Sequence, residues 1–483
     1  MASLKKNFFY SIFLTTSSYL MSLVVFPYVS RVLGPASLGL VGLTDGAVGC
    51  FTLLATMGIN SLGIREIAKY RNDREKLSDI YSNLFSLSLI FTAIGVAGFI
   101  ITGLLVPNLR QYPGLIIFGA LSIAAQVCVI EWFYKGMENF RYITVRGVIV
   151  KLCYIIAVFL LIKNPDDYLI YFALVVATYA VNAIINIIYS RRFARFSLKG
   201  LQLRTWVKPF LFLGSYTILG ALYTTFDQLF LGIVTTDTEV GYYAVSVKVF
   251  TIILGVFTAL TSVLMPRMSA MIANKQRDAF ISDTTRTIDT FVIFAIPLTI
   301  LGIAYSPQIV LLIAGGAYHD AILPMQILMP LIFLIGYEQI LIVQILTPLN
   351  CDRIILRNSL LVALIVIILN FCIVSRLGAI GSALIWTSGE TFLLIISQIY
   401  SSRLTGISFP YKKLISTAVI CAPGISIIIA LRIIMENIWM EAIAGIISFL
   451  IVYIFIQIYI VRNKTFLLFI DAILPKRKEI SER

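Results

Sequence analysis

Residues 38–60 read LGLVGLTDGAVGCFTLLATMGIN, an apolar stretch with one charged residue, Asp45. A helix needs about 20 mainly apolar residues to cross the hydrocarbon core of a bilayer. Similar runs recur along all 483 residues, and the chain is 59% hydrophobic and only 13% charged. Soluble domains carry about 25% charged residues. The sequence therefore predicts an all-α polytopic membrane protein and excludes a β-barrel, whose strands would alternate over about ten residues.

We predict about 14 transmembrane helices from these runs. The first run follows Lys5 and Lys6, but it is too long for the apolar region of a signal peptide and no cleavage site follows it. It is therefore interpreted as the first span. The predicted spans cover approximately residues 8–30, 38–60, 80–105, 114–134, 143–162, 168–189, 210–234, 242–266, 290–314, 322–347, 358–374, 380–400, 414–431 and 440–461.

The distribution of basic residues predicts the orientation, since cytoplasmic loops carry an excess of Lys and Arg. With the N-terminus inside, 31 of the 38 Lys and Arg residues fall in cytoplasmic segments and four fall in outside loops. Both termini are thus predicted to be cytoplasmic. This bias also accounts for the net charge of +14 without a nucleic acid as partner.

The two halves of the chain share a short pattern. Leu33-Gly34 is followed by Leu38-Gly39, and about 200 residues later Leu231-Gly232 is followed by Val240-Gly241. Internal repeats of this kind are common in secondary transporters. We predict a unit of six spans with its cytoplasmic loop at 1–209, a second six-span unit at 210–413, and two further spans with a cytoplasmic tail at 414–483.

The sequence lacks the motifs of nucleotide-driven transport and of hydrolases, including G-x-x-x-x-G-K-[ST], H-E-x-x-H and G-x-S-x-G. Its six cysteines form no C-x-x-C pair, and its one histidine, His319, falls in a short loop. We therefore expect no metal site, no cofactor and no enzymatic activity. Three classes of protein remain open: a secondary transporter, a channel, and a membrane enzyme that acts through carboxylates.

Eight ionisable residues fall at apparent membrane depth. Each charge at the centre of a span costs roughly 2.5–3.5 kcal/mol, so eight facing lipid would cost on the order of 20 kcal/mol. We therefore expect them to line a cavity or to pair between helices. The acids are Asp45, Glu131, Asp227, Glu338 and Glu390, and the bases are Arg31, Lys151 and Lys248.

Other roles remain open for some of these residues. Glu131 and Lys151 lie near span ends, where they can extend to the membrane interface. Asp45 lies in LTDG, and Asp-Gly is a common cap or turn sequence. If the halves are repeats, however, Asp45 and Lys248 occupy nearly equivalent places and would face each other or a shared cavity.

Six ordered segments between about residues 7 and 400 carry a family resemblance. The chain resembles the polysaccharide transport proteins, the lipid-linked oligosaccharide flippases of the O-antigen type. These belong to the multidrug/oligosaccharidyl-lipid/polysaccharide exporter superfamily. The segments are FPYVSRVLGPASLGLVG, MGINSLGIREIAKYRND, EWFYKGMENFRYITVRGVIVK, FDQLFLG followed by VGYYAVSVKV, QILTPLNCDRIILRNS, and LGAIGSALIWTSGE.

The resemblance implies two six-helix lobes around a central cavity, with two further C-terminal helices. It implies alternating access for an undecaprenyl-diphosphate-linked oligosaccharide repeat unit, a step of O-antigen and lipopolysaccharide synthesis at the bacterial inner membrane. A glycan polymerase and a chain-length regulator are the protein partners it suggests. Predicted cavity residues are Arg31, Asp45, Lys151, Asp227, Lys248, Glu338 and Glu390.

Arg31 and Lys248 are expected to attract the diphosphate. The excess of acids at depth suggests a coupling cation, Na⁺ or H⁺. Two alternatives remain open, a multidrug or cation exporter of the same superfamily and a membrane glycan polymerase or ligase. The polymerase or ligase would need a sizeable outside loop, and none longer than about ten residues is predicted.

Overall fold

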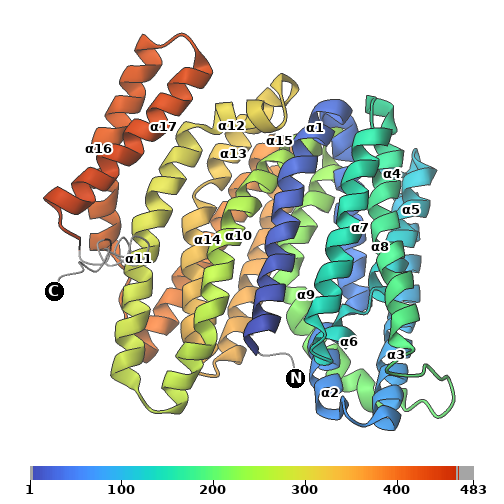
Figure 1. Cartoon of the computed structure of the whole chain (residues 1–483). Helices are drawn as coiled ribbons and strands as arrows, with labels where there is room; N and C mark the ends of the chain where they lie inside the picture. The colour runs from blue at the N-terminus through green and yellow to red at the C-terminus, as the bar shows by residue number, and fades with distance from the viewer. Residues whose placement is uncertain (1–3, 464–465, 467–483) are drawn as a thin grey trace, which may run out of the picture. The chain divides into compact units, whose positions relative to one another are not determined.

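The computed structural model describes the backbone of residues 4–463 and residue 466, and every regular element in this part is helical (Figure 1). The first half holds α1 (Leu4–Thr56), α2 (Ile59–Tyr70), α3 (Arg74–Leu105), α4 (Pro107–Arg110), α5 (Pro113–Cys128), α6 (Glu131–Gly136), α7 (Phe140–Leu161), η1 (Pro165–Asp167) and α8 (Tyr168–Ser190). The second half holds α9 (Leu203–Val234), α10 (Asp237–Ala273), α11 (Arg277–Ala304), α12 (Ser306–Ile313), η2 (Gly316–Ala321), α13 (Ile322–Leu328), α14 (Leu331–Gln339), η3 (Ile340–Leu346), α15 (Asp352–Thr405), α16 (Tyr411–Ile434), α17 (Ile438–Phe455) and η4 (Ile456–Ile460).

Among the described residues, nine helices are long and apolar enough to cross a membrane, and a helix pair bent by 41° brings the number to ten if it is counted as one span. The all-α membrane fold predicted from the sequence is thus confirmed. Two of these helices each contain two predicted spans, because positive φ angles break α1 at Gly34 and α15 at Gly378. Parts of α9 and α10 have side chains outside the described set, so the number of 14 stays a prediction.

The chain forms two compact units that interleave along the sequence. Unit 1 comprises residues 1–252, 310–324 and 359–389, and unit 2 comprises residues 253–309, 325–358 and 390–483. This division does not test the six-span units whose boundaries are predicted at residues 209 and 413, so those boundaries stay a prediction. The greater part of the predicted cytoplasmic tail, residues 464, 465 and 467–483, lies outside the described residues.

In unit 1, α1 packs against α3, α5, α7 and α9. The glycines of the repeated pattern lie where α1 meets α10. A Cβ atom on Gly39 would be 1.7 Å from the Asp237 carbonyl oxygen, and one on Gly241 would be 2.1 Å from the Pro35 carbonyl oxygen. The matching glycines of the two halves therefore allow a reciprocal close approach of backbones, as small residues do between membrane helices.

In unit 2, α16 packs against α17 and α11. Its interior includes Tyr305, Phe449 and Tyr453, all of which are buried. Gly424 lies against the Phe449 ring, where a Cβ atom would be 2.6 Å from the ring. The C-terminal pair of helices thus shares a core with α11, while side chains such as Ile433 and Ile451 are exposed as expected of a lipid-facing surface.

Candidate functional site

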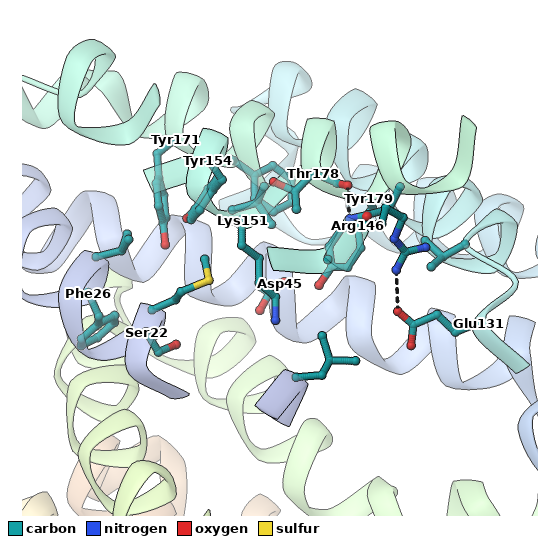
Figure 2. A pocket seen from close by; sticks show the side chains of 18 of the residues that line it. Ser22, Phe26, Asp45, Glu131, Arg146, Lys151, Tyr154, Tyr171, Thr178 and Tyr179 are labelled. Carbon is teal, nitrogen blue, oxygen red and sulfur yellow. Dashed lines mark hydrogen bonds and ion pairs between the residues drawn. The ribbon is translucent and has the colours of Figure 1, made fainter. Parts of the chain in front are cut away.

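Unit 1 contains a cavity of about 750 Å³ between membrane-spanning helices (Figure 2). It is lined from α1, α6, α7, α8 and α10 by four basic and two acidic side chains, together with several tyrosines. The basic residues are Lys135, Arg146, Lys151 and Lys248, and the acidic residues are Asp45 and Glu131. The cavity therefore has an excess of two positive charges, although the sequence predicted more acids than bases at membrane depth.

Helix α7 supplies one wall because its two faces differ. Its exposed apolar side chains recur every three or four residues, which places them on one face of the helix. The opposite face carries Arg146, Lys151 and Tyr154, which line the cavity. An apolar face toward lipid and a polar face toward the interior is the arrangement expected of a membrane helix that borders a water-filled space. The exposed residues of this face are Val145, Ile149, Leu152, Ile156 and Leu160, and Leu161 at the end of α7 is exposed as well.

Asp45 and Lys248 lie in this same cavity. The helix is continuous through Asp45, since Gly34 is its one non-helical residue, so Asp45 does not cap a helix break. The Asp45 side chain is exposed to the cavity, and it interacts electrostatically with the half-buried Lys248. The placement agrees with the interpretation that these two residues face a shared space.

Three tyrosines surround the carboxylate of Asp45. Tyr154, Tyr171 and Tyr179 line the same cavity as Asp45, and each interacts electrostatically with it. A tyrosine combines an apolar ring with a hydroxyl that both donates and accepts. This end of the cavity therefore offers the mixture of surfaces that a carbohydrate requires.

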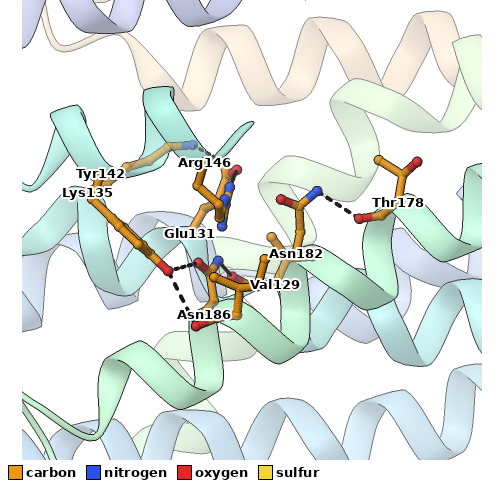
Figure 3. Close-up of polar contacts among 9 residues, drawn as sticks. Val129, Glu131, Lys135, Tyr142, Arg146, Thr178, Asn182 and Asn186 are labelled. Atoms are coloured by element: carbon orange, nitrogen blue, oxygen red, sulfur yellow. Dashed lines mark hydrogen bonds and ion pairs between the residues drawn. The ribbon is translucent and has the colours of Figure 1, made fainter. Parts of the chain in front are cut away.

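The other end of the cavity is built on a break between α5 and α6, where Ile130 has a positive φ of 43°. Figure 3 shows how Asn186 of α8 stabilises this break. Its Nδ2 donates to the Val129 carbonyl, and its Oδ1 accepts a hydrogen bond of 2.9 Å from the Tyr142 hydroxyl. The Tyr134 hydroxyl donates to the backbone carbonyl of Asn186. The network places Glu131, the first residue of α6, at the cavity.

Glu131 joins two cations at this end. Its Oε1 lies 3.0 Å from Arg146 Nη2, and its Oε2 lies 3.3 Å from Lys135 Nζ. The Arg146 guanidinium also lies 5.9 Å from the centroid of the Tyr142 ring. Arg146 and Lys135 are absent from the predicted site because the sequence places them in a basic cytoplasmic segment. Arg146 falls within the predicted span 143–162, but it was counted with the basic segment at the start of that span.

Three of the seven predicted site residues, Asp45, Lys151 and Lys248, thus line one cavity. Arg31 does not. It is exposed at the end of the first segment of α1, where its Nη2 donates to the carbonyl oxygens of Leu311 and Leu312. Beside it, the Ser30 Oγ donates to the Ile313 carbonyl at 3.1 Å. Arg31 therefore joins two helical segments within unit 1 and is not a wall of the cavity.

Asp227 occupies a separate, fully buried place in unit 1. Its Oδ1 accepts a hydrogen bond of 2.8 Å from Asn370 Nδ2, and its Oδ2 has no hydrogen-bond partner among the described residues. The Asn370 Oδ1 and the nearby Tyr243 hydroxyl are buried and equally unpartnered. Three unsatisfied oxygen atoms around one carboxylate are uncommon in a protein interior, where buried polar groups usually find partners.

The last two predicted residues, Glu338 and Glu390, are buried in unit 2, where their carboxyl groups interact electrostatically. Glu338 lies two residues before the π-helical segment η3, a geometry that is frequent at functional sites. A third buried carboxylate, Glu441, accepts hydrogen bonds from Gln308 Nε2 at 3.1 Å and from the Tyr305 hydroxyl at 3.3 Å. No group of three or more His, Cys, Asp or Glu residues that could hold a metal occurs in the described part of the chain.

Comparison with known proteins gives both a fold and a family. The solved structure of the lipid II flippase MurJ in an inward closed conformation matches with a TM-score of 0.71, at 13% identity, over 94% of this chain and 98% of that one. An inward-facing multidrug resistance MATE family transporter of the MOP superfamily matches with a TM-score of 0.60, at 15% identity, over 81% and 94%. These likenesses establish the fold.

Two curated proteins of similar sequence are named as O-antigen transporters. A protein of Escherichia coli (strain K12) named "Putative O-antigen transporter" is 21% identical over 79% of this chain and 92% of its own length. A protein of the same name from Shigella dysenteriae is 26% identical over 34% of this chain and 41% of its own length. The model of the family described as "Polysaccharide biosynthesis protein" matches residues 4–272, more than half of the chain. The chain is therefore a multi-pass membrane protein that belongs to the polysaccharide biosynthesis protein family.

Proposed function

We propose that this protein is a flippase that moves an undecaprenyl-diphosphate-linked oligosaccharide repeat unit across the bacterial inner membrane by alternating access. The observation that carries the proposal is the polar, positively charged cavity of unit 1. The relatives named as O-antigen transporters and the flippase fold support it. The substrate would travel from the cytoplasmic to the outer leaflet.

The cavity addresses the main physical obstacle to this reaction. A hydroxyl group transferred into an apolar medium without a hydrogen-bond partner costs roughly 1–3 kcal/mol on mutational scales, and an oligosaccharide carries many. A cavity lined by tyrosines, amides and charged groups replaces the lost water contacts. Its volume of about 750 Å³ lies within the usual range for ligand sites of roughly 300–1,000 Å³. The prenyl chain can remain in the lipid.

The charge of the cavity argues against the cation exporter of the same superfamily. With four basic and two acidic side chains, the cavity repels a small organic cation and attracts an anionic head group. A polymerase or ligase finds no support in the relatives, which are named as transporters, or in the structural neighbours, which are flippases and transporters.

Ion coupling is the second part of the proposal. No nucleotide-binding motif is visible in the sequence, so an ion gradient or the membrane potential would drive transport. Asp227, Asn370 and Tyr243 offer unpartnered oxygen atoms that suit Na⁺, and the Asp227 carboxylate alone suits a proton. We therefore propose this buried group as the coupling site.

Orientation and partners complete the proposal. Both termini would be cytoplasmic, and a glycan polymerase with its chain-length regulator would receive the product. Reporter fusions at Asn108, Asp166 and Asp320 would then report outside, and fusions at Arg74, Phe196 and Arg277 would report inside. A reversed pattern would overturn the orientation.

Deletion of the gene tests the function. The deletion strain should lose surface display of the glycan, and its lipid-linked repeat unit should accumulate in the inner leaflet. Re-expression of the intact chain should restore display. A strain that still displays the glycan but becomes sensitive to cationic dyes would instead support the drug exporter.

A further inference from the structure

A second cavity, of about 490 Å³, lies in unit 2 where the ends of several helices meet. It is bordered by the end of α10, the start of α11, the turn that follows η3 and the end of α15. Five apolar and two basic side chains contribute to its lining, and none of the described lining residues is acidic. The lining residues are Ile272, Lys275, Arg277, Phe280, Ile281, Leu349, Cys351, Leu404 and Thr405. The proposed transport cycle does not use this cavity.

Leu349 and Leu404 indicate the depth of the cavity relative to the membrane. They lie two and four residues past the ends of the spans predicted at 322–347 and 380–400. At 1.5 Å per helical residue these separations are about 3–6 Å, which corresponds to the head-group region just outside the hydrocarbon core. Both span ends are on the predicted cytoplasmic side, where the leaflet carries anionic lipids. In the predicted orientation, the cavity therefore lies beside anionic head groups.

The two basic residues have charge available for a ligand. Arg277 donates one hydrogen bond of 2.8 Å, from Nη2 to the Leu404 carbonyl oxygen, which joins the start of α11 to the end of α15. In the described part of the chain, neither Arg277 nor Lys275 forms an ion pair with an acidic residue. Both residues are exposed. Two cations beside an apolar wall complement a molecule that has an anionic head and an apolar body.

The backbone of Lys275 gives a separate reason to assign a role to its side chain. Its φ is 57°, in the left-handed region that Gly and Asn adopt at lower cost than Lys. The turn after η3, on the other side of the cavity, has Asn350 at the equivalent φ of 56°. The lysine at position 275 therefore costs folding free energy that binding of an anion would offset.

We propose that this cavity binds the head group of an anionic phospholipid of the cytoplasmic leaflet. Lys275 and Arg277 contact the phosphate, and the acyl chains lie along Ile272, Ile281 and Leu404. The site goes beyond the proposed function and does not depend on which substrate crosses the membrane. The bound lipid joins the turn between α10 and α11 to the end of α15, so it stabilises the folded state. A soluble phosphate ester shares the head-group chemistry and is the competing ligand.

The test measures binding of a fluorescent phosphatidylglycerol to the purified full-length protein in detergent. Lys275→Asn should weaken binding by about fivefold, and the double variant with Arg277→Gln by about twentyfold, since each basic group contributes attraction of this order. Lys275→Arg should bind like the unaltered protein, because it keeps the charge. The matched control is Lys199→Asn, which removes an exposed lysine from a predicted cytoplasmic loop outside the cavity and should leave binding unchanged.

Lys275→Asn also separates binding from folding. In phosphatidylcholine alone, this variant should unfold at the same temperature as the unaltered protein or higher, because asparagine suits a φ of 57°. Added phosphatidylglycerol should raise the unfolding temperature of the unaltered protein, and that of the variant by less. A lysine with a purely structural role would give the reverse pattern, a lower unfolding temperature in phosphatidylcholine and an unchanged response to phosphatidylglycerol.

Three results would overturn the proposal. One is normal phosphatidylglycerol binding by the folded double variant. The second is equally tight binding of phosphatidylcholine, which would show that the negative charge of the head group does not matter. The third is displacement of the lipid by glycerol 3-phosphate at equal concentration, which would assign the cavity to a soluble phosphate. If the double variant does not fold, Leu404→Glu replaces it, because an acidic group in the wall should repel the lipid, and normal binding by this variant would contradict the proposal equally.

Discussion

Asp45 and Asp227 are two aspartates of unit 1 that occupy opposite environments. The sequence places both at membrane depth, within apolar helices. Asp45 is exposed to a cavity shared with Lys248 and three tyrosines. Asp227 is 0% exposed, and among the described residues it receives one hydrogen bond, from Asn370. The difference shows that a charged residue within a membrane helix can face a hydrated cavity or lie in a closed polar site. Only the packing of the surrounding helices decides which of these two environments it has.

The largest expected effect comes from Asp227→Asn. Asparagine keeps the shape and an oxygen atom for Asn370 but removes the charge that a cation requires. Ion-driven transport in liposomes should fall roughly tenfold or more, as expected when a coupling free energy is lost. Full ion-driven transport by a folded variant would remove Asp227 from the coupling mechanism.

A smaller effect is expected from Asp45→Asn. In a hydrated cavity the interaction between Asp45 and Lys248 is screened, so its loss should slow transport by about two- to fivefold. The matched control is the double variant Asp45→Asn with Lys248→Gln, which restores the charge balance and should recover part of the rate. The contrast between the two aspartates would fail if Asp45→Asn were as damaging as Asp227→Asn in the same flipping assay.

The smallest effect on transport is expected from Asn186→Ala, which acts on stability. It removes the hydrogen bonds to Val129 and Tyr142. Buried groups left without partners should lower the free energy of unfolding by about 1–3 kcal/mol. Asn182→Ala is the control, because the Asn182 side chain bonds to the Thr178 carbonyl within the same helix. Equal unfolding temperatures for the two variants would show that the break between α5 and α6 does not depend on Asn186.

Composition and apolar run length predicted the fold class, because bilayer thickness sets the length of a spanning helix directly. The glycine pattern predicted an internal repeat but not the contact in which Gly39 and Gly241 approach opposing backbones. Arg146 was missed because it lies near the start of the predicted span 143–162 and was counted with the basic cytoplasmic segment before it.

The partners of the charged residues could not be predicted in the same way. Arg31 sits in an apolar run like Asp45, yet it bonds to the carbonyl oxygens of Leu311 and Leu312, which are remote in sequence. The Asp227–Asn370 and Glu338–Glu390 contacts also join distant helices. Such contacts depend on how each helix is rotated about its axis. That rotation is set by packing against neighbouring helices, which the local sequence does not specify.

The most direct test of a hydrated cavity in unit 1 is thiol labelling at positions 45 and 227. Asp45→Cys and Asp227→Cys would be compared in a background without native cysteines, using a membrane-impermeant reagent on folded protein in open membranes. We predict rapid modification at position 45 and none at position 227. An unreactive thiol at position 45 would contradict the account, because the cavity would then be closed to water.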